Sequence, residues 1–214
     1  MDTFNELSLD QITTHLKTAY VPMHRPQNTR TGREAAVLIP LLRQVDGWHL
    51  LYIRRSVSPH DPHSGQVAFA GGKYEKQDRD LVHTALREAE EEIGIAQDDV
   101  TLLGQLNCHQ SISRYRITPV VGYIDWPYPL RLQASEVGRA FTLPLDWLAA
   151  PDNHEIRELE RHGQRYPVAY FREYDGELLW GATARMTLSL LKTLQLSADS
   201  SQPLQQEGSV AQYA

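Results

Sequence analysis

Three glutamates follow a glycine pair at spacings that place them on one side of a helix. At 100° per residue, Glu88, Glu91 and Glu92 fall in one arc, with Glu92 nearest the apolar side. Such like charges repel by roughly 0.2–0.5 kcal/mol per pair, and Arg87, four residues before Glu91, offsets part of this. Clustered carboxylate oxygens suit Mg²⁺ or Mn²⁺, which also accept oxygens from water and phosphate. The pattern therefore predicts divalent-metal chemistry on a phosphate-bearing substrate.

The helix that carries these glutamates is predicted over residues 81–93. Its apolar stripe would dock on a core and consists of Leu81, Ala85, Leu86, Ala89 and Ile93. Gly94 ends the helix, and Glu90 points away from the other glutamates. Gly71 and Gly72 open the loop before the helix, where they form a tight turn or let the backbone approach metal or phosphate closely. An isolated run of glutamates would be a solvated helix face, but this setting argues against that reading.

The stretch from Gly72 to Ile95 resembles the Nudix box, Gly-x5-Glu-x7-Arg-Glu-U-x-Glu-Glu-x-Gly-U, in which U is apolar. The second half matches position for position, at Arg87, Glu88, Ala89, Glu91, Glu92, Gly94 and Ile95. The first half departs, because Gly72 lies 15 residues before Arg87 instead of 14 and Asp78 replaces the first glutamate. One inserted loop residue accounts for the spacing. The resemblance implies an α/β fold, the Nudix-type α/β/α sandwich with a mixed β-sheet, and hydrolysis of a P–O–P bond with Mg²⁺ or Mn²⁺.

Upstream residues resemble the coenzyme A pyrophosphatase branch of the Nudix family. The branch signature, Leu-Leu-Thr-x-Arg-Ser-x3-Arg-x3-Gly-x3-Phe-Pro-Gly-Gly, aligns with residues 51–72 and is matched by Leu51, Arg55, Ser56, Gly65, Phe69, Gly71 and Gly72. His60 replaces the second arginine, one extra residue precedes Gly65, and Ala70 replaces the proline. Segments 84–89, 117–120 and 180–185 are also similar to this branch, so the resemblance spans about residues 34–195.

The resemblance also implies roles for individual residues. The expected metal ligands are Glu88, Glu91, Glu92 and Gly72, and the expected substrate contacts are Arg55, His60, Gly71 and Gly72. Arg87 is expected to orient the glutamates. The general base is one of the helix glutamates or Glu136, since a downstream glutamate often reaches the metals in Nudix enzymes; otherwise Glu136 is a surface residue. Metal ligation by His60 and His63 is disfavoured, because no acidic or cysteine partner accompanies them at a fixed spacing.

Composition limits the other classes of function. The chain has 214 residues, 41% apolar and 22% charged, as expected of a globular protein, and its net charge of −6 argues against a nucleic-acid surface. A phosphate-bearing substrate remains compatible, because bound metals reverse the local charge. The single Cys108 excludes an intramolecular disulfide, and we expect it to be structural in a reducing cytoplasm. With no signal peptide and no apolar run near the ~20 residues of a membrane helix, no membrane partner is expected.

The remaining pattern divides the chain into three parts. Residues 1–33 are predicted to form an N-terminal helix and connector, 34–196 the Nudix hydrolase domain, and 197–214 a disordered tail rich in Ser and Gln. Helices are predicted at 8–19, 81–93, 144–148 and 182–196, and strands at 35–42, 48–54, 65–69, 100–106, 117–124 and 141–143. Residues 166–180 are predicted to form a hairpin about Asp175–Gly176. Pro40 predicts an edge or a bulge in its strand.

The function expected from these features is hydrolysis of CoA or acyl-CoA to phosphopantetheine and an adenosine bisphosphate. Another nucleoside diphosphate derivative, such as ADP-ribose or a dinucleotide, is the alternative that His60 keeps open. A non-catalytic ligand sensor is disfavoured because every glutamate in the second half of the box is present, and an RNA-decapping enzyme would need a basic face. Homodimers are frequent in the family, although no apolar stripe here identifies an interface.

Overall fold

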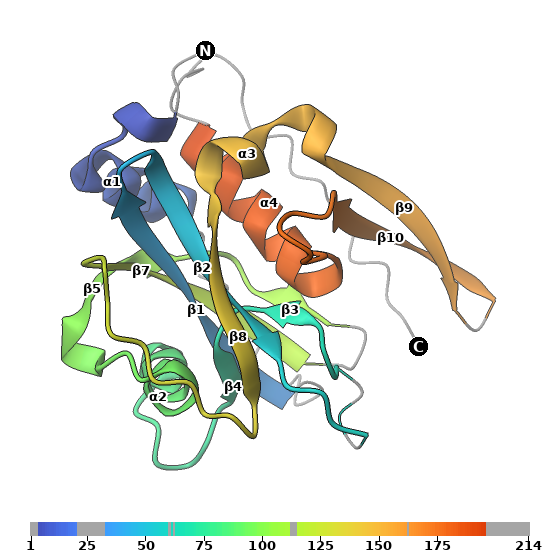
Figure 1. The fold of residues 1–214 in the computed structure, drawn as a ribbon, viewed down its shortest axis with the longest axis horizontal. Helices are drawn as coiled ribbons and strands as arrows, with labels where there is room; N and C mark the ends of the chain where they lie inside the picture. Colours follow the sequence, from blue (N-terminus) through green and yellow to red (C-terminus); the bar gives the residue numbers. More distant parts are fainter. Residues whose placement is uncertain are drawn as a thin grey trace.

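The computed structural model describes residues 4–20, 33–59, 61, 63–111, 115–161 and 163–195. Its centre is a sheet of eight strands with helices on both faces (Figure 1). The strands are β1 (Arg33–Gln44), β2 (Gly47–Arg55), β3 (Val67–Ala68), β4 (Gly71–Lys73), β5 (Val100–Gln105), β6 (His109–Gln110), β7 (Tyr115–Ile124) and β8 (Val137–Pro144). The expected α/β fold with a mixed sheet is confirmed.

The sheet is mixed because β1 pairs in parallel with β7, whereas its other pairings are antiparallel. The main strand order is β3-β2-β1-β7-β5, and β4, β6 and β8 pair with β1, β7 and β2 respectively. The chain therefore leaves β2 through β3 and crosses to β1 through β4, immediately before the helix that carries the glutamates. This crossing places the two glycines against the centre of the sheet.

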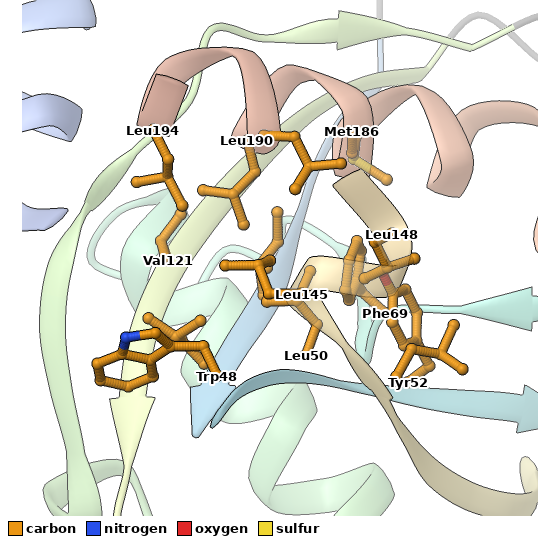
Figure 2. Packing of buried hydrophobic residues seen from close by; sticks show 14 of the residues in the cluster. Trp48, Leu50, Tyr52, Phe69, Val121, Leu145, Leu148, Met186, Leu190 and Leu194 are labelled. Carbon is orange, nitrogen blue, oxygen red and sulfur yellow. The ribbon is translucent and has the colours of Figure 1, made fainter. Parts of the chain in front are cut away.

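Two apolar cores fill the space on either side of the sheet. Helix α2 (Leu81–Ile93) covers one face, and α1 (Leu9–Ala19), α3 (Leu145–Ala149) and α4 (Gly181–Gln195) cover the other. Strand residues alternate between the cores, so Leu51 and Ile53 pack toward α2 while Leu50 and Tyr52 pack toward α4. In Figure 2, Leu50 lies below Leu190 of α4, and Tyr52 lies below Leu148 of α3 and Met186 of α4. Short 3₁₀ turns lie at Phe4–Glu6, Gln97–Asp99 and Pro151–Asn153.

Helix α2 begins and ends where its sequence predicts. The Asp80 side chain caps the first turn by accepting a hydrogen bond from the His83 backbone N–H at 2.8 Å. At the other end Gly94 adopts the left-handed conformation, with φ of 72°, and its N–H donates to Glu90 O. The predicted N-terminal helix is also present, with Ser8 as its N-cap. Fixed ends hold the glutamates of α2 in a fixed rotation relative to the sheet.

The edge or bulge predicted at Pro40 is wrong. Pro40 lies within the continuous, central strand β1, opposite Gly122 of β7. On the other side of β1, Val37 is the last residue paired with β4, and Leu41 is the first paired with β2. The Leu38 N–H donates to Ala70 O on that side, so the nitrogen of Pro40 points into the interval between β4 and β2. No ladder hydrogen bond is lost there, which is why proline is tolerated.

A second sheet contains a long hairpin that the sequence did not predict. Strand β9 (His154–Arg161) pairs antiparallel with β10 (Gln164–Phe171), and the pair projects from the body of the protein (Figure 1). The predicted hairpin about Asp175–Gly176 is also present, with one antiparallel bridge between Tyr174 and Glu177 and another between Tyr170 of β10 and Trp180. Most residues of β9 are charged, and its two apolar residues, Ile156 and Leu159, are three positions apart, so the strand lacks the polar–apolar alternation that predicts a strand.

Other predictions at the ends of the chain fall partly outside the described residues. The N-terminal helix packs into the core on the α4 side, where Ile12 and Leu16 are fully buried. The connector over 21–32 and the tail over 197–214 lie outside the described part. Among the helices that are described, none combines the length and apolar character needed to cross a bilayer.

Candidate active site

Docking of α2 directs its glutamates toward the glycine strand β4. Glu92 is buried, at 2% exposure, and its Oε2 accepts a hydrogen bond of 3.0 Å from the Gly71 N–H. Glu88 is partly buried, and the side chain of Glu91 is 58% exposed. Glu90 is exposed and accepts a hydrogen bond from the Gln97 amide. The three glutamates predicted to share one arc therefore form a gradient from the buried edge of the helix to solvent.

The two glycines of β4 are needed for different reasons. A Cβ atom at Gly72 would lie 2.4 Å from Glu88 Oε1, so this glycine makes room for a carboxylate. A Cβ atom at Gly71 would lie 2.4 Å from the backbone oxygen of Ala36, within the pairing of β4 and β1. Both distances are shorter than van der Waals contact. The backbone of Gly72 thus lies directly against Glu88, as a shared metal site would require.

Alanine at these two positions is expected to separate activity from stability. In Gly72→Ala the methyl group displaces the end of a side chain, so hydrolysis should be largely lost while the unfolding free energy changes little. In Gly71→Ala it meets backbone, which cannot move without opening the β1–β4 pairing, and the cost should be about 1–3 kcal/mol. Urea denaturation and activity assays on both variants check this. Equal effects of the two substitutions on stability would contradict it.

Arg87 links the helix glutamates to the loop before the helix. Its guanidinium contacts Asp78 twice, through Nε to Oδ1 at 2.9 Å and through Nη2 to Oδ2 at 3.1 Å. It also lies 3.0 Å from Glu88 Oε1 and 3.0 Å from Glu91 Oε2, and it donates to the backbone oxygen of Lys73. A planar guanidinium with several donors can hold this many partners at once. Arg87 therefore contacts carboxylates and backbone of the protein itself, as the predicted orienting role requires.

Asp78 is the structural partner of Arg87, a role that the sequence comparison did not assign to it. Its side chain is fully buried, and it accepts further hydrogen bonds from Thr84 Oγ1 and from the Glu75 backbone N–H, both at 2.9 Å. His83 Nδ1 lies 3.0 Å away. The only sequence signal was positional, since Asp78 stands where the Nudix box has its first glutamate. The shorter side chain still reaches Arg87, in a loop that is one residue longer.

Asp78 should make the protein lose stability as the pH falls into the acid range. The Arg87 guanidinium, opposed by burial and aided by the other donors, holds the pKa of Asp78 well below its usual range. A depressed folded-state pKa stabilises the protein fully above the unfolded value of about 3.9, and this contribution is lost as the pH falls below it. Urea midpoints between pH 2 and pH 6 should therefore fall more steeply for the wild type than for Asp78→Asn. Parallel curves would contradict this.

The carboxylates of α2 lie close to a fourth one, Glu136. Burial raises the pKa of Glu92 to about 7, against the opposing effects of the Gly71 N–H and Arg55, and the charges of Glu88 and Glu136 raise it further. Burial likewise raises the pKa of Glu88, with Glu136 adding to the effect. Glu136 precedes β8, and its backbone oxygen accepts the Ser56 N–H at 2.8 Å. The pairing of β8 with β2 thus brings this distant residue to the helix glutamates.

This collection of oxygens fits a divalent cation. Several carboxylates gather around a glycine backbone, and a bound cation would relieve both their mutual repulsion and the cost of burying Glu92. Within the described residues no three acidic, histidine or cysteine side chains already converge on one point. The three glutamates are held apart by their contacts. Arg87 pairs with Glu88 and Glu91, whereas Glu92 accepts a hydrogen bond from the Gly71 N–H. The donor chemistry is that of Mg²⁺ or Mn²⁺ ligands.

The predicted substrate contacts are only partly brought together. Arg55 lies at the end of β2 beside the carboxylates, with Nη1 at 3.8 Å from Glu92 Oε1. Its Nε donates to Asp61 Oδ2 at 2.8 Å, an acidic partner that was not predicted because nothing in a loop sequence fixes which residues meet. His60 lies outside the described residues. His63 is exposed, and its Nδ1 lies 3.1 Å from Gln66 Oε1.

Comparison with known proteins identifies the family of this chain. The NUDIX domain family model matches residues 32–163. The uncharacterized Nudix hydrolase NudL of Photorhabdus laumondii is 37% identical over 77% of this chain and 87% of its own, and that of Pectobacterium atrosepticum is 37% identical over 89% and 95%. A solved MutT/nudix family protein from Enterococcus faecalis is 16% identical, over 86% of this chain and 68% of its own, with a TM-score of 0.48. The chain belongs to the Nudix family.

Proposed function

We propose that the protein is a metal-dependent pyrophosphohydrolase that cleaves the diphosphate of CoA or acyl-CoA, releasing phosphopantetheine and an adenosine bisphosphate. The observation that carries the hydrolase is the placement of Glu88 and Glu92 against the glycine strand β4, where the charge of Glu136 also acts on both. The similarity of residues 51–72 to the coenzyme A branch supports CoA, and the position of Arg55 next to Glu92 adds to that support.

The residues proposed to hold Mg²⁺ or Mn²⁺ are Glu88, Glu91, Glu92 and the backbone of Gly72. The bound ion would neutralise charge on the phosphates and lower the pKa of a water nucleophile. Attack of water on one phosphorus atom breaks the P–O–P bond, and the bridging oxygen leaves with the other phosphate. Arg55 would bind a phosphate oxygen, for which it exchanges its contact with Asp61.

The proton of the attacking water needs a carboxylate acceptor that no metal saturates. Glu136 is a candidate because it is exposed, close to the helix glutamates and carried by a different element, so it can face the water from another direction. One of the helix glutamates is the other candidate. In this scheme Arg87 and Asp78 position the glutamates and do not touch the substrate.

A different nucleoside diphosphate derivative, such as ADP-ribose or a dinucleotide, is the second candidate substrate. The observation that favours it is His60, which replaces an arginine of the coenzyme A signature, together with Ala70 in place of proline. Both substitutions fall between β2 and β4 in the sequence, and Ala70 directly precedes Gly71 of β4. They concern the choice of substrate and leave the proposed hydrolysis unchanged.

Product analysis by mass spectrometry tests both candidates. The protein is incubated with Mg²⁺ or Mn²⁺ and with CoA, acetyl-CoA, ADP-ribose, NADH or dinucleotide polyphosphates. Phosphopantetheine and adenosine bisphosphate are the expected products from CoA, and both should disappear in Glu92→Gln. Cleavage of another substrate with CoA intact would refute the CoA assignment. Binding without turnover of any compound would refute the enzyme and indicate a ligand sensor.

A further inference from the structure

A group of polar and cationic side chains occupies the face of the sheet opposite the glutamates, at the end where β1, β4, β6 and β7 meet. The strand pairings place these residues in two rows. The first row is His109–Ile117–Ala35–Lys73. The second row, two residues earlier in β7 and β1, is Tyr115–Arg33. Directly paired residues project from the same face. The two rows therefore form one surface built from four strands.

Strand alternation fixes which face this is. Gly72 lies against Glu88 and hence faces α2, so the next residue, Lys73, projects to the opposite side, which α4 covers. Charge effects agree with this placement, because Arg185 of α4 influences His109. The surface and the glutamates thus lie on the two sides of one short strand, a single residue apart.

Cationic side chains gather around Tyr115 on this surface. Arg33 Nη1 lies 3.4 Å from the Tyr115 hydroxyl, and the guanidinium carbon is 5.8 Å from the centre of the Tyr115 ring. The hydrogen bond from Arg33, with help from Lys73, lowers the pKa of Tyr115. Burial, with a smaller effect from Arg185, lowers the pKa of His109 to about 4. The shift of Tyr115 is thus caused mainly by the nearby cations, whereas that of His109 is caused mainly by burial.

Nothing in the described part of the chain neutralises the two cations nearest to β4. Neither Lys73 nor Arg33 forms an ion pair with a described carboxylate. The neighbouring Glu34 projects to the other face and lies 3.8 Å from Arg116. In addition, His109 Nε2 is buried without a hydrogen-bond partner. An anion would satisfy the charges that the protein leaves open here.

We propose that Lys73, Arg33 and Tyr115 form a second anion subsite, which binds a phosphomonoester on the nucleotide half of the substrate. The inference rests on the proposed function, because it assumes a diphosphate held by the glutamates and Gly72. Lys73 directly follows Gly72 in β4 but projects to the opposite face, so a substrate held by the glutamates and Gly72 would reach the subsite by passing around this end of the sheet. Of the two candidate substrates, CoA carries such a phosphate on its adenosine ribose, and ADP-ribose does not.

The chemistry of the three side chains matches a phosphomonoester. Such a group carries about −1.5 to −2 charges at pH 7 and three acceptor oxygens. Lys73 and Arg33 supply cationic donors, and the Tyr115 hydroxyl adds a neutral donor between them. The backbone of Lys73 is held through its carbonyl oxygen by Arg87, so the position of the subsite is fixed relative to the helix glutamates.

Steady-state kinetics with CoA and dephospho-CoA test the subsite. The wild type with Mg²⁺ should prefer CoA by about tenfold to a hundredfold in kcat/KM, the range expected for one or two charge-assisted hydrogen bonds. Lys73→Gln and Tyr115→Phe should remove most of this preference by raising KM for CoA, with kcat and the values for dephospho-CoA nearly unchanged. Lys192→Gln, an exposed charge change on α4, serves as the matched control and should keep the preference.

Calorimetric binding of adenosine 3′,5′-bisphosphate and of AMP in the presence of Mg²⁺ separates the subsite from the hydrolase. The bisphosphate should bind about tenfold or more tightly than AMP, and Arg33→Gln or Lys73→Gln should abolish the difference. If CoA is not cleaved but this difference persists, the subsite stands and the proposed substrate falls. If CoA is cleaved but the two ligands bind equally, or if Lys73→Gln weakens both equally, the subsite is refuted.

Discussion

Glu92→Gln is expected to lower kcat for diphosphate hydrolysis by about 10²–10⁴-fold and at the same time to stabilise the metal-free protein. Glutamine has the same shape, and its amide oxygen can still accept the Gly71 N–H. It lacks the charge that a bound cation requires. In the absence of metal that charge is a cost, because the Glu92 carboxylate is buried and lies near Glu88 and Glu136.

The sign of the stability effect follows from the pKa of Glu92. An acid whose folded-state pKa is raised to about 7 destabilises the folded protein at every pH above its unfolded value near 4.3. At pH 8 without metal, Glu92→Gln should therefore unfold at a higher temperature than the wild type. Adding Mg²⁺ or Mn²⁺ should stabilise the wild type by binding the folded state and should stabilise the variant much less.

Glu90→Gln is the matched control for this experiment. Glu90 is on the same helix but is exposed and turned away from β4. Its replacement should leave kcat within about twofold and the response to metal unchanged, since surface changes of this kind are usually small. Full activity of Glu92→Gln, or equal stabilisation of both variants by metal, would contradict the role of Glu92 as a ligand.

Asp78→Ala is expected to cost about 3–5 kcal/mol of unfolding free energy, because it leaves a largely buried guanidinium without its main partner. The Asp78 side chain has no exposed surface, and that of Arg87 is 12% exposed. Activity should fall as well, since the freed Arg87 retains only Glu88 and Glu91 as acidic partners and the loop before α2 loses its anchor. Urea denaturation of the two proteins measures the first effect.

A double-mutant cycle distinguishes the ion pair from a general packing defect. If the cost comes from the unpaired guanidinium, Asp78→Ala combined with Arg87→Ala should be clearly less destabilising than the sum of the single changes. Asp78→Asn keeps the size and should fall between the wild type and Asp78→Ala. Additive free energies in the cycle would show that Asp78 acts through Thr84 and the backbone of the loop and not through Arg87.

The sequence predicted those features that depend on local periodicity and capping. The caps of α2 determine its ends, and its apolar stripe determines which side of the helix faces the sheet. Glu92 was therefore expected at the buried edge and Glu90 away from it. The place of Glu136 was a hypothesis taken from the family, because it depends on the pairing of β8 with β2. The Asp61 contact of Arg55 had no sequence signal, since it lies within a loop.

The errors have equally specific causes. Proline is disfavoured in central strands because it cannot donate a ladder hydrogen bond. At Pro40 no such bond is needed, because its nitrogen faces the gap between β4 and β2. Strand β9 was missed because a projecting hairpin has little core to face, so its residues need not alternate between polar and apolar. Asp78 was recognised as a departure from a pattern, whereas its burial and its bond to Arg87 required the three-dimensional structure.

The parallel pairing of β1 with β7 should shape events during synthesis of the protein. Arg33 and Tyr115, which face each other across this pairing, are 82 residues apart in the chain. At about 5–20 residues per second, the ribosome needs roughly 4–16 s after β1 to produce its partner β7. Both faces of β1 are apolar. Until then β1 has only β2 and β4 as neighbours. The nascent chain is therefore expected to aggregate or to recruit chaperones most readily in this interval, before β7 emerges.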